Sequence, residues 1–152
     1  MSKCYDPQMH TAEHIMNRTM VLLLGCDRSF SSHLNAGKSK CDYHFHRDLT
    51  DAEAGELERR VNGQIGRSLP VYAEYVDWAT AETLVDVAHL PSGVDRSQPL
   101  RLVRVGDYDV CACIGEHVEN TAQIGAFRLV SHSFTPGEDG RQGVLRLRFK
   151  VG

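Results

Sequence analysis

Two histidines stand four residues apart in a segment whose pattern is otherwise that of an amphipathic helix. The segment, residues 9–16, reads MHTAEHIM and contains His10 and His14. Four residues advance a helix by about 400°, so the two side chains project to one face with Cβ atoms about 6 Å apart. This spacing lets two imidazoles bind one metal ion, although an isolated H-x3-H pattern is also common by chance.

A second pair with the same spacing lies about a hundred residues further along the chain. Cys113 and His117 form C-x3-H within CACIGEHVENT, residues 111–121. Zinc binds thiolate and imidazole, and one cysteine with three histidines is an acceptable tetrahedral set. The two pairs together therefore predict a zinc site formed by His10, His14, Cys113 and His117, which the fold must close over a long range.

The remaining cysteines are expected to be structural. The five cysteines are odd in number and no secretion signal accompanies them, so we expect free thiols or metal ligands and not disulfides; they are Cys4, Cys26, Cys41, Cys111 and Cys113. Cys111 alternates with Cys113, so on a strand the two would point to opposite faces. Cys26, Cys41 and Cys111 are therefore interpreted as buried small hydrophobic residues.

Composition and charge are those of an ordinary globular chain. The 152 residues are 41% hydrophobic and 24% charged, enough for a single domain spanning residues 1–152. With 20 acidic and 17 basic residues the net charge is −3, so contact with a nucleic acid would have to use a local patch. The N-terminus lacks signal-peptide features, and the longest apolar run, MVLLLG, is far shorter than the roughly 20 residues of a membrane span. We expect a cytoplasmic protein with no membrane partner.

Two helices are expected in the first half of the chain. The Asp6-Pro7 pair is a good N-terminal cap, and Gly25 can end the helix that it begins. The sequence from Thr50 to Glu53 is a capping-box pattern for a second helix. Three apolar residues of that helix share one face, Leu57, Val61 and Ile65.

Strands are expected as an early hairpin and as a later series that dominates the last third of the chain. A hairpin is expected early, with strands at residues 28–35 and 39–46 joined through Asn35 to Lys38. Further strands are expected at residues 69–76, 100–106, 108–114, 124–134 and 143–152. Residues 79–99 give a mixed pattern, with loops at Pro91-Ser92-Gly93 and Pro99. Helices early and strands late favour an α+β fold, an antiparallel sheet packed with helices.

These motifs resemble the editing domain of alanyl-tRNA synthetases, and most closely the free-standing AlaX-type trans-editing proteins, over nearly the whole chain. That family has H-x3-H, a Cys-Gly-Gly-Thr-His-Val-like motif and a Thr-x-x-Ile-Gly-x-Phe stretch. Here HTAEH occupies residues 10–14 and CIGEHVENTAQIGAFRLVSH occupies residues 113–132. The segments HLNAGKSKCDYHF, residues 33–45, and VRVGDYDVCACIGEHV, residues 103–118, are also similar. The last family stretch is matched by Thr121, Ile124, Gly125 and Phe127.

The resemblance implies an α+β editing domain that hydrolyses the ester of a mischarged tRNA in trans. Zinc would be bound by His10, His14, Cys113 and His117, and would activate water, polarise the ester or hold the substrate. Ser-tRNA(Ala) is the expected substrate and Gly-tRNA(Ala) the next, because a pocket sized for alanine excludes glycine poorly and rejects one added hydroxyl only modestly. The partner is thus mischarged tRNA; nothing in the sequence implies ATP, and the oligomeric state is left open.

Three side chains beside the ligand pairs are candidates for roles in catalysis. Thr11 is a candidate to bind the serine hydroxyl, with a hydrogen bond back to a helix carbonyl as the alternative. Glu116 and Glu13 are candidate general bases, although a solvent-facing position is favoured for Glu13. Ile114 and Glu116 stand where the family has glycine and threonine, which leaves the amino-acid specificity open.

Three other functions fit parts of the pattern. GEHVENT, residues 115–121, also resembles the editing domain of threonyl-tRNA synthetases, which acts on Ser-tRNA(Thr) and can work without zinc. A non-catalytic, zinc-stabilised module that binds aminoacyl-tRNA would use the same four ligands. Residues 10–14 also match H-x-x-E-H, the inverted zinc-protease motif, but this leaves Cys113 and His117 unexplained.

Binding of tRNA would require a local group of basic side chains. Arg146 and Arg148 alternate with apolar residues in VLRLRFKV, residues 144–151, and so share one strand face. Lys38, Lys40 and Arg47 flank the expected hairpin. These five residues are the candidate phosphate contacts, with a solvated surface as an equally good interpretation.

Overall fold

The computed structural model of the protein describes residues 6–90 and 94–152, so that Cys4 and the expected loop Pro91-Ser92-Gly93 lie outside the described residues. The fold is α+β, as expected. In chain order the elements are α1 (Pro7–Leu24), β1 (Ser31–His33), β2 (Ser39–Phe45), α2 (Asp51–Gly66), β3 (Val71–Val76), α3 (Trp78–Leu84), η1 (Val87–His89), β4 (Leu100–Val105), β5 (Asp109–Ala112), η2 (Thr121–Ile124), β6 (Phe127–Thr135) and β7 (Gly143–Val151). None of the helices in these residues combines the length and hydropathy needed to cross a membrane.

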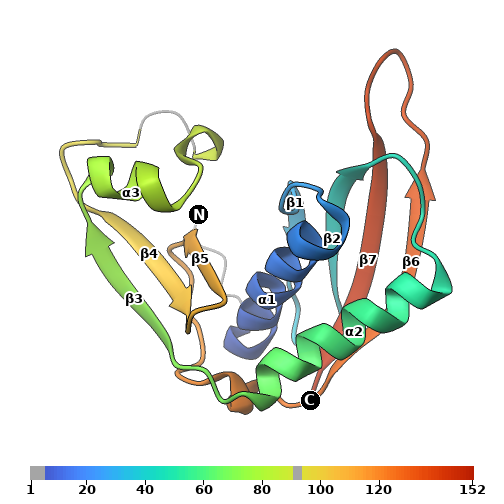
Figure 1. Cartoon of the computed structure of the whole chain (residues 1–152), viewed down its shortest axis with the longest axis horizontal. Helices are drawn as coiled ribbons and strands as arrows, with labels where there is room; N and C mark the ends of the chain where they lie inside the picture. The colour runs from blue at the N-terminus through green and yellow to red at the C-terminus, as the bar shows by residue number, and fades with distance from the viewer. Residues whose placement is uncertain (1–5, 91–93) are drawn as a thin grey trace.

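The strands form two sheets, and both are antiparallel, as expected. The larger sheet has the order β1-β2-β7-β6 and the smaller one the order β3-β4-β5. In Figure 1 the two sheets diverge from a common base, with α1 between them and α2 running along the larger sheet. The sheets are separate because the chain leaves β5 after Ala112 and runs past α1 before β6 begins.

Helix α1 has the ends that the sequence predicts and is buried on more than one side. The Asp6 side chain accepts a hydrogen bond from the Met9 amide at 3.1 Å, and Gly25 ends the helix in the left-handed conformation with φ of 71°. Its apolar side packs into the core, where the buried residues are Met9, Ala12, Ile15, Met16 and Met20. Its polar edge is buried too, and consists of His10, Thr11, His14 and Asn17. A buried polar edge needs hydrogen-bond partners from the rest of the fold.

Helix α2 packs against the larger sheet and contributes to the core. Its capping box is present, and the predicted apolar face of Leu57, Val61 and Ile65 is buried. Asn62 on the same helix exchanges two hydrogen bonds with the backbone of Phe127, donating at 2.9 Å and accepting at 2.8 Å. These bonds fix the point at which β6 starts.

One local expectation was wrong, and one segment of mixed pattern contains a helix. That helix is α3, which Asp77 caps by accepting from the Thr80 amide at 2.7 Å. Ile124 lies in η2 and not in a strand, because Asn120 caps a helical turn there and Gly125, with φ of 82°, redirects the chain before β6.

We expect Thr50→Ala to lower the free energy of unfolding by about 1 kcal/mol, since it removes the hydroxyl that caps α2. In the structure this hydroxyl accepts from the Glu53 amide at 3.1 Å. Urea unfolding of the wild type, Thr50→Ala and the control Thr50→Ser measures the effect. Equal losses in both variants would contradict a role for the hydroxyl.

Candidate metal centre

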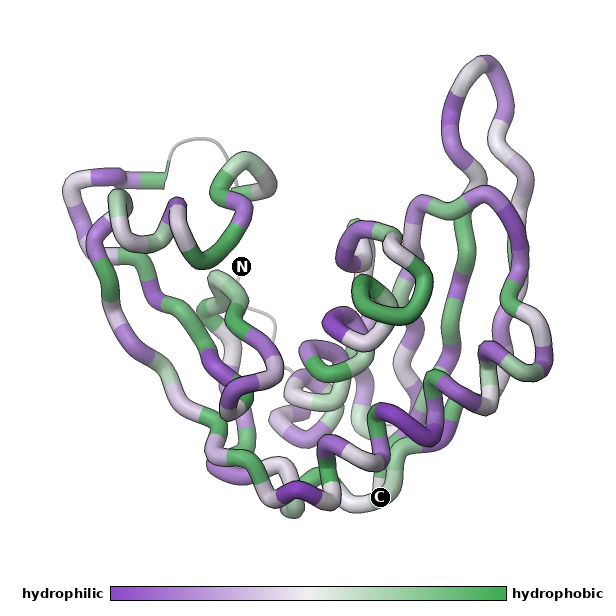
Figure 2. Tube along the Cα trace, in the orientation of Figure 1, coloured by the Kyte–Doolittle hydropathy of each residue, from purple (hydrophilic) through white to green (hydrophobic). Residues whose placement is uncertain are grey.

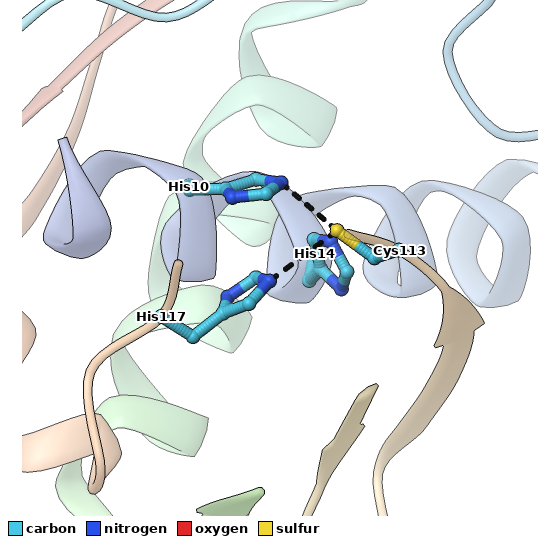
Figure 3. Close-up of side chains that lie close together, drawn as sticks. All are labelled: His10, His14, Cys113 and His117. Atoms are coloured by element: carbon cyan, nitrogen blue, oxygen red, sulfur yellow. Dashed lines mark hydrogen bonds between the residues drawn. The ribbon is translucent and has the colours of Figure 1, made fainter. Parts of the chain in front are cut away.

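The structure brings together the four residues predicted to bind a metal (Figure 3). One side-chain ligand atom from each of His10, His14, Cys113 and His117 lies within 4.8 Å of the others. The Cys113 Sγ atom is 3.3 Å from His10 Nε2 and 3.5 Å from His117 Nε2. The His10 and His117 rings stack with centroids 4.1 Å apart, and His14 lies edge-on to both. Residues separated by about a hundred positions thus form one cluster.

The distances and donor atoms fit a metal ion. Tetrahedral zinc, with bonds of about 2.3 Å to sulfur and about 2.1 Å to nitrogen, places these ligand atoms about 3.6 Å apart. The two sulfur-to-nitrogen distances in the cluster are close to this value. The cluster is therefore able to hold a metal.

The conformation of the loop after β5 places Cys113 and His117 next to α1. The guanidinium of Arg101, on β4, donates to the Cys113 carbonyl at 2.6 Å and to the Gly115 carbonyl at 3.2 Å. A side chain at residue 115 could not be accommodated, because its Cβ would lie 2.2 Å from Cε1 of the His10 ring. The close approach of loop and helix thus requires glycine at this position.

Hydrogen bonds orient two of the imidazole rings. His10 Nδ1 lies 3.1 Å from the Glu116 carbonyl oxygen, which can only accept, so this nitrogen carries the proton. His117 Nδ1 lies 2.9 Å from the Thr11 hydroxyl, which donates its own proton to the Pro7 carbonyl at 2.9 Å and therefore accepts from the ring. Both rings present Nε2 as a lone-pair donor towards Cys113, as metal ligation requires.

Thr11 positions His117 and does not face a substrate. Its hydroxyl is fully buried and, besides these two bonds, accepts from the Val118 amide at 3.2 Å. One proton and two lone pairs are then all used. The expected contact with a serine hydroxyl is therefore not supported, and the alternative of a bond to a helix carbonyl matches the structure.

A buried carboxylate that the sequence did not reveal lies behind His14. Asp109 Oδ2 is 3.7 Å from His14 Nδ1. The same carboxylate accepts from Arg18 Nε at 3.1 Å and from Arg28 at 2.7 Å and 3.2 Å. Two guanidinium groups offset the cost of burying its charge, and the carboxylate lies beyond hydrogen-bond distance of the His14 ring.

Burial keeps the histidines of the cluster neutral. It lowers the pKa of His10 and takes the pKa of His14 well below its ordinary value. For His117, burial together with the nearby charges of His10 and Arg101 lowers the pKa to about 3. Burial also raises the pKa of the Cys113 thiol, so that a bound cation is needed to favour the thiolate.

The two candidate bases are placed opposite to expectation. The Glu13 side chain is only 12% exposed, and its Oε1 lies 3.9 Å from Nε2 of both His10 and His14. Burial raises the pKa of Glu13, an effect that a hydrogen bond with Ser32 partly opposes. The side chain of Glu116 is exposed, and this residue meets the cluster only through its carbonyl oxygen. The expectation that Glu13 faces solvent was wrong, because the helix edge that carries it is covered.

A cavity of about 720 Å³ adjoins the cluster, within the usual range for ligand pockets. His10, Glu13, His14 and Cys113 are on its wall, and α1, residues 26–32, residues 84–86 and β5 contribute the rest. Figure 2 shows apolar segments at the last turn of α1 and after α3. The cluster therefore borders a space formed between the two sheets.

The other described cysteines divide into two groups. Cys26 and Cys41 are buried, as expected. Cys111 is only half-buried and lines the same cavity as Cys113. The expected alternation of faces does not apply because β5 ends at Ala112, before Cys113.

The five basic candidates for RNA contact lie apart from the cavity wall. In the paired strands β2 and β7 the alternate residues are buried, so Lys40, Arg146 and Arg148 lie on the other face of the larger sheet. Arg146 makes two hydrogen bonds to Asp42, at 2.8 Å and 2.9 Å. Arg47 is likewise paired, at 2.7 Å and 2.8 Å, with Glu53. Lys38 is exposed, and contact of this group with RNA stays a prediction.

Comparison with known proteins relates the chain to tRNA synthetases. Residues 100–148 match the family described as the threonyl and alanyl tRNA synthetase second additional domain. The alanine–tRNA ligase of Hyperthermus butylicus is 35% identical over 150 residues, and that of Aeropyrum pernix is 33% identical over 144 residues. Each alignment covers 94% of this chain but only 15% of the relative, so the chain spans a small part of these enzymes' length. The resemblance to the editing domain family of alanyl-tRNA synthetases is confirmed.

We expect Thr11→Val to weaken metal binding about 10- to 100-fold, the usual cost of removing a group that orients a ligand. Thr11→Ser keeps the hydroxyl and should bind zinc as the wild type does. Competition with a chromogenic chelator measures the affinity, and circular dichroism checks that each variant is folded. Identical affinities in all three proteins would show that the hydroxyl does not orient His117.

Proposed function

Since this chain is a relative of the alanyl-tRNA synthetases, matched over almost its whole length, we propose that it is an aminoacyl-tRNA deacylase. In this proposal it hydrolyses the ester of a mischarged tRNA at a zinc centre formed by His10, His14, Cys113 and His117. The observation that carries the proposal is the convergence of these four side chains beside a cavity of about 720 Å³, whose wall includes three of them, His10, His14 and Cys113. Such a space has room for an aminoacyl ester and part of its ribose.

The chain's own groups hold the reaction site in place. When bound, zinc supplies a charge that can polarise a carbonyl or lower the pKa of water. The Glu116 carbonyl and the Thr11 hydroxyl orient the rings of His10 and His117.

Serine on alanine tRNA is the substrate that we propose first, with glycine on alanine tRNA second. The similarity to alanine–tRNA ligases supports the choice of tRNA. The need for editing follows from the weak discrimination that a pocket sized for alanine achieves against a smaller residue or one extra hydroxyl.

Serine on threonine tRNA is a second candidate substrate. The family that matches residues 100–148 is named for both the threonyl and the alanyl enzymes. This chain also has Glu116 between Gly115 and His117, and Ile114 in a position that is 91% exposed, so the segment departs from the alanyl pattern.

The proposal predicts metal-dependent deacylation of one among Ser-tRNA(Ala), Gly-tRNA(Ala) and Ser-tRNA(Thr). The rate should fall by about 100-fold or more in Cys113→Ala and His117→Ala, the usual effect of losing a main electrostatic stabiliser. A chelator should have the same effect on the wild type. Release of labelled amino acid from each tRNA measures the rate.

A matched control is His132→Ala. This histidine lies on β6 and pairs with Asp48 at 2.7 Å, so its loss should leave deacylation unchanged. If the wild type binds zinc and aminoacyl-tRNA but hydrolyses none of the three esters, the non-catalytic binding module replaces the deacylase. Activity that persists in Cys113→Ala would contradict a role for the cluster.

A further inference from the structure

Glu13 lies beside the cluster but has no role in the hydrolysis proposed above. It lies on α1 between His10 and His14, lines the cavity, and is 12% exposed. Its carboxylate oxygen is equally close, at 3.9 Å, to the Nε2 atoms of both histidines. A carboxyl group therefore lies on the cavity wall directly beside the cluster.

The surroundings of Glu13 differ from those of the other buried carboxylate nearby. Asp109 is paired with two arginines, Arg18 and Arg28. No lysine or arginine nitrogen in residues 6–90 or 94–152 lies within 4.0 Å of the Glu13 carboxylate. A buried carboxylate is stabilised by a cation at hydrogen-bond distance, and here the cavity is the side from which one can approach.

A small polar group on β1 and the segment before it supports Glu13 from the other side. Ser32, like the charge of Arg28, opposes the rise that burial causes in the pKa of Glu13, and its hydroxyl lies 3.1 Å from that of Ser29 and 3.4 Å from the Cys41 Sγ. Neutral hydroxyls fix the direction of the carboxylate without neutralising it. The carboxylate is thus oriented yet retains capacity to accept from a ligand.

The chemistry of an aminoacyl ester places a cation at this point. Its α-nitrogen lies about 2.5 Å from the carbonyl carbon, as bond lengths near the α-carbon dictate. An ester whose carbonyl is at the cluster therefore brings its ammonium group within reach of Glu13. Esters of N-acylated amino acids have an uncharged amide at the same place, and hydroxy-acid esters have a hydroxyl.

We propose that Glu13 binds the α-ammonium group of the aminoacyl ester and so restricts the site to esters of free amino acids, an inference that rests on the proposed deacylase function. Peptidyl-tRNA and N-acetylaminoacyl-tRNA lack this ammonium group and are poor substrates. Glu13 is then a specificity residue, distinct from the groups that hold the cluster.

The test compares wild type and Glu13→Gln on two esters of the same tRNA. One carries serine, and the other carries the corresponding hydroxy acid, in which a hydroxyl replaces the ammonium group. For the serine ester we expect kcat/KM to fall about 10- to 100-fold in Glu13→Gln, mainly through KM, because a charge-assisted hydrogen bond becomes a neutral one. For the hydroxy-acid ester the two proteins should agree. Glu119→Gln, an exposed glutamate on the loop after Cys113, is the control.

Other results would overturn the assignment. An equal fall for both esters would make Glu13 a proton acceptor or a structural group, and a fall in bound zinc per chain would make it part of the metal centre. Equal rates in wild type and variant would also exclude the ammonium contact.

Binding separates failure of this inference from failure of the deacylase proposal. Calorimetry with the amide-linked seryl analogue of adenosine, which cannot be hydrolysed as an ester, reports on Glu13 even if no tRNA is deacylated. The wild type should bind this analogue more tightly than its des-amino counterpart, and Glu13→Gln should lose that preference. No preference in the wild type would overturn the role of Glu13, whatever the outcome with tRNA.

Discussion

Burial of the polar edge of α1 is the constraint on which the rest of the site depends. A helix edge that carries imidazoles and a hydroxyl is costly to remove from water unless each group finds a partner. The loop after β5 supplies those partners: the Glu116 carbonyl for His10, and the His117 ring and Val118 amide for Thr11. The loop can approach so closely only because residue 115 is glycine. The contact that pairs buried groups is therefore also the contact that assembles the cluster.

The two carboxyl groups near the cluster, those of Asp109 and Glu13, have different roles. Asp109 is paired with Arg18 and Arg28 and lies 3.7 Å from His14 Nδ1. Glu13 is supported by neutral hydroxyls and faces the cavity. One carboxylate thus contributes to rigidity and the other to recognition, a division set by their partners and not by residue type. Lys40, Arg146 and Arg148 lie on the face of β2 and β7 opposite to the buried residues of these strands.

Local patterns predicted the helices and the ligand pairs well, because caps and spacings act within a few residues. Asp6, Gly25 and the capping box from Thr50 to Glu53 are examples. Positions that depend on packing were not predictable. Glu13 is interpreted as solvent-facing from the sequence, but the tertiary fold leaves its side chain only 12% exposed. Asp109 gave no signal because its partners, Arg18 and Arg28, are more than eighty residues away.

The central claim is that both ends of the chain bind one metal ion through one sulfur and three nitrogens. Cobalt(II) in place of zinc tests it most directly, because its absorption spectrum reports the geometry and the ligands. The account predicts one cobalt per chain, with the strong visible bands of a tetrahedral centre and a thiolate charge-transfer band that disappears in Cys113→Ala. Weak octahedral bands without thiolate charge transfer, or the same spectrum in wild type and Cys113→Ala, would contradict it.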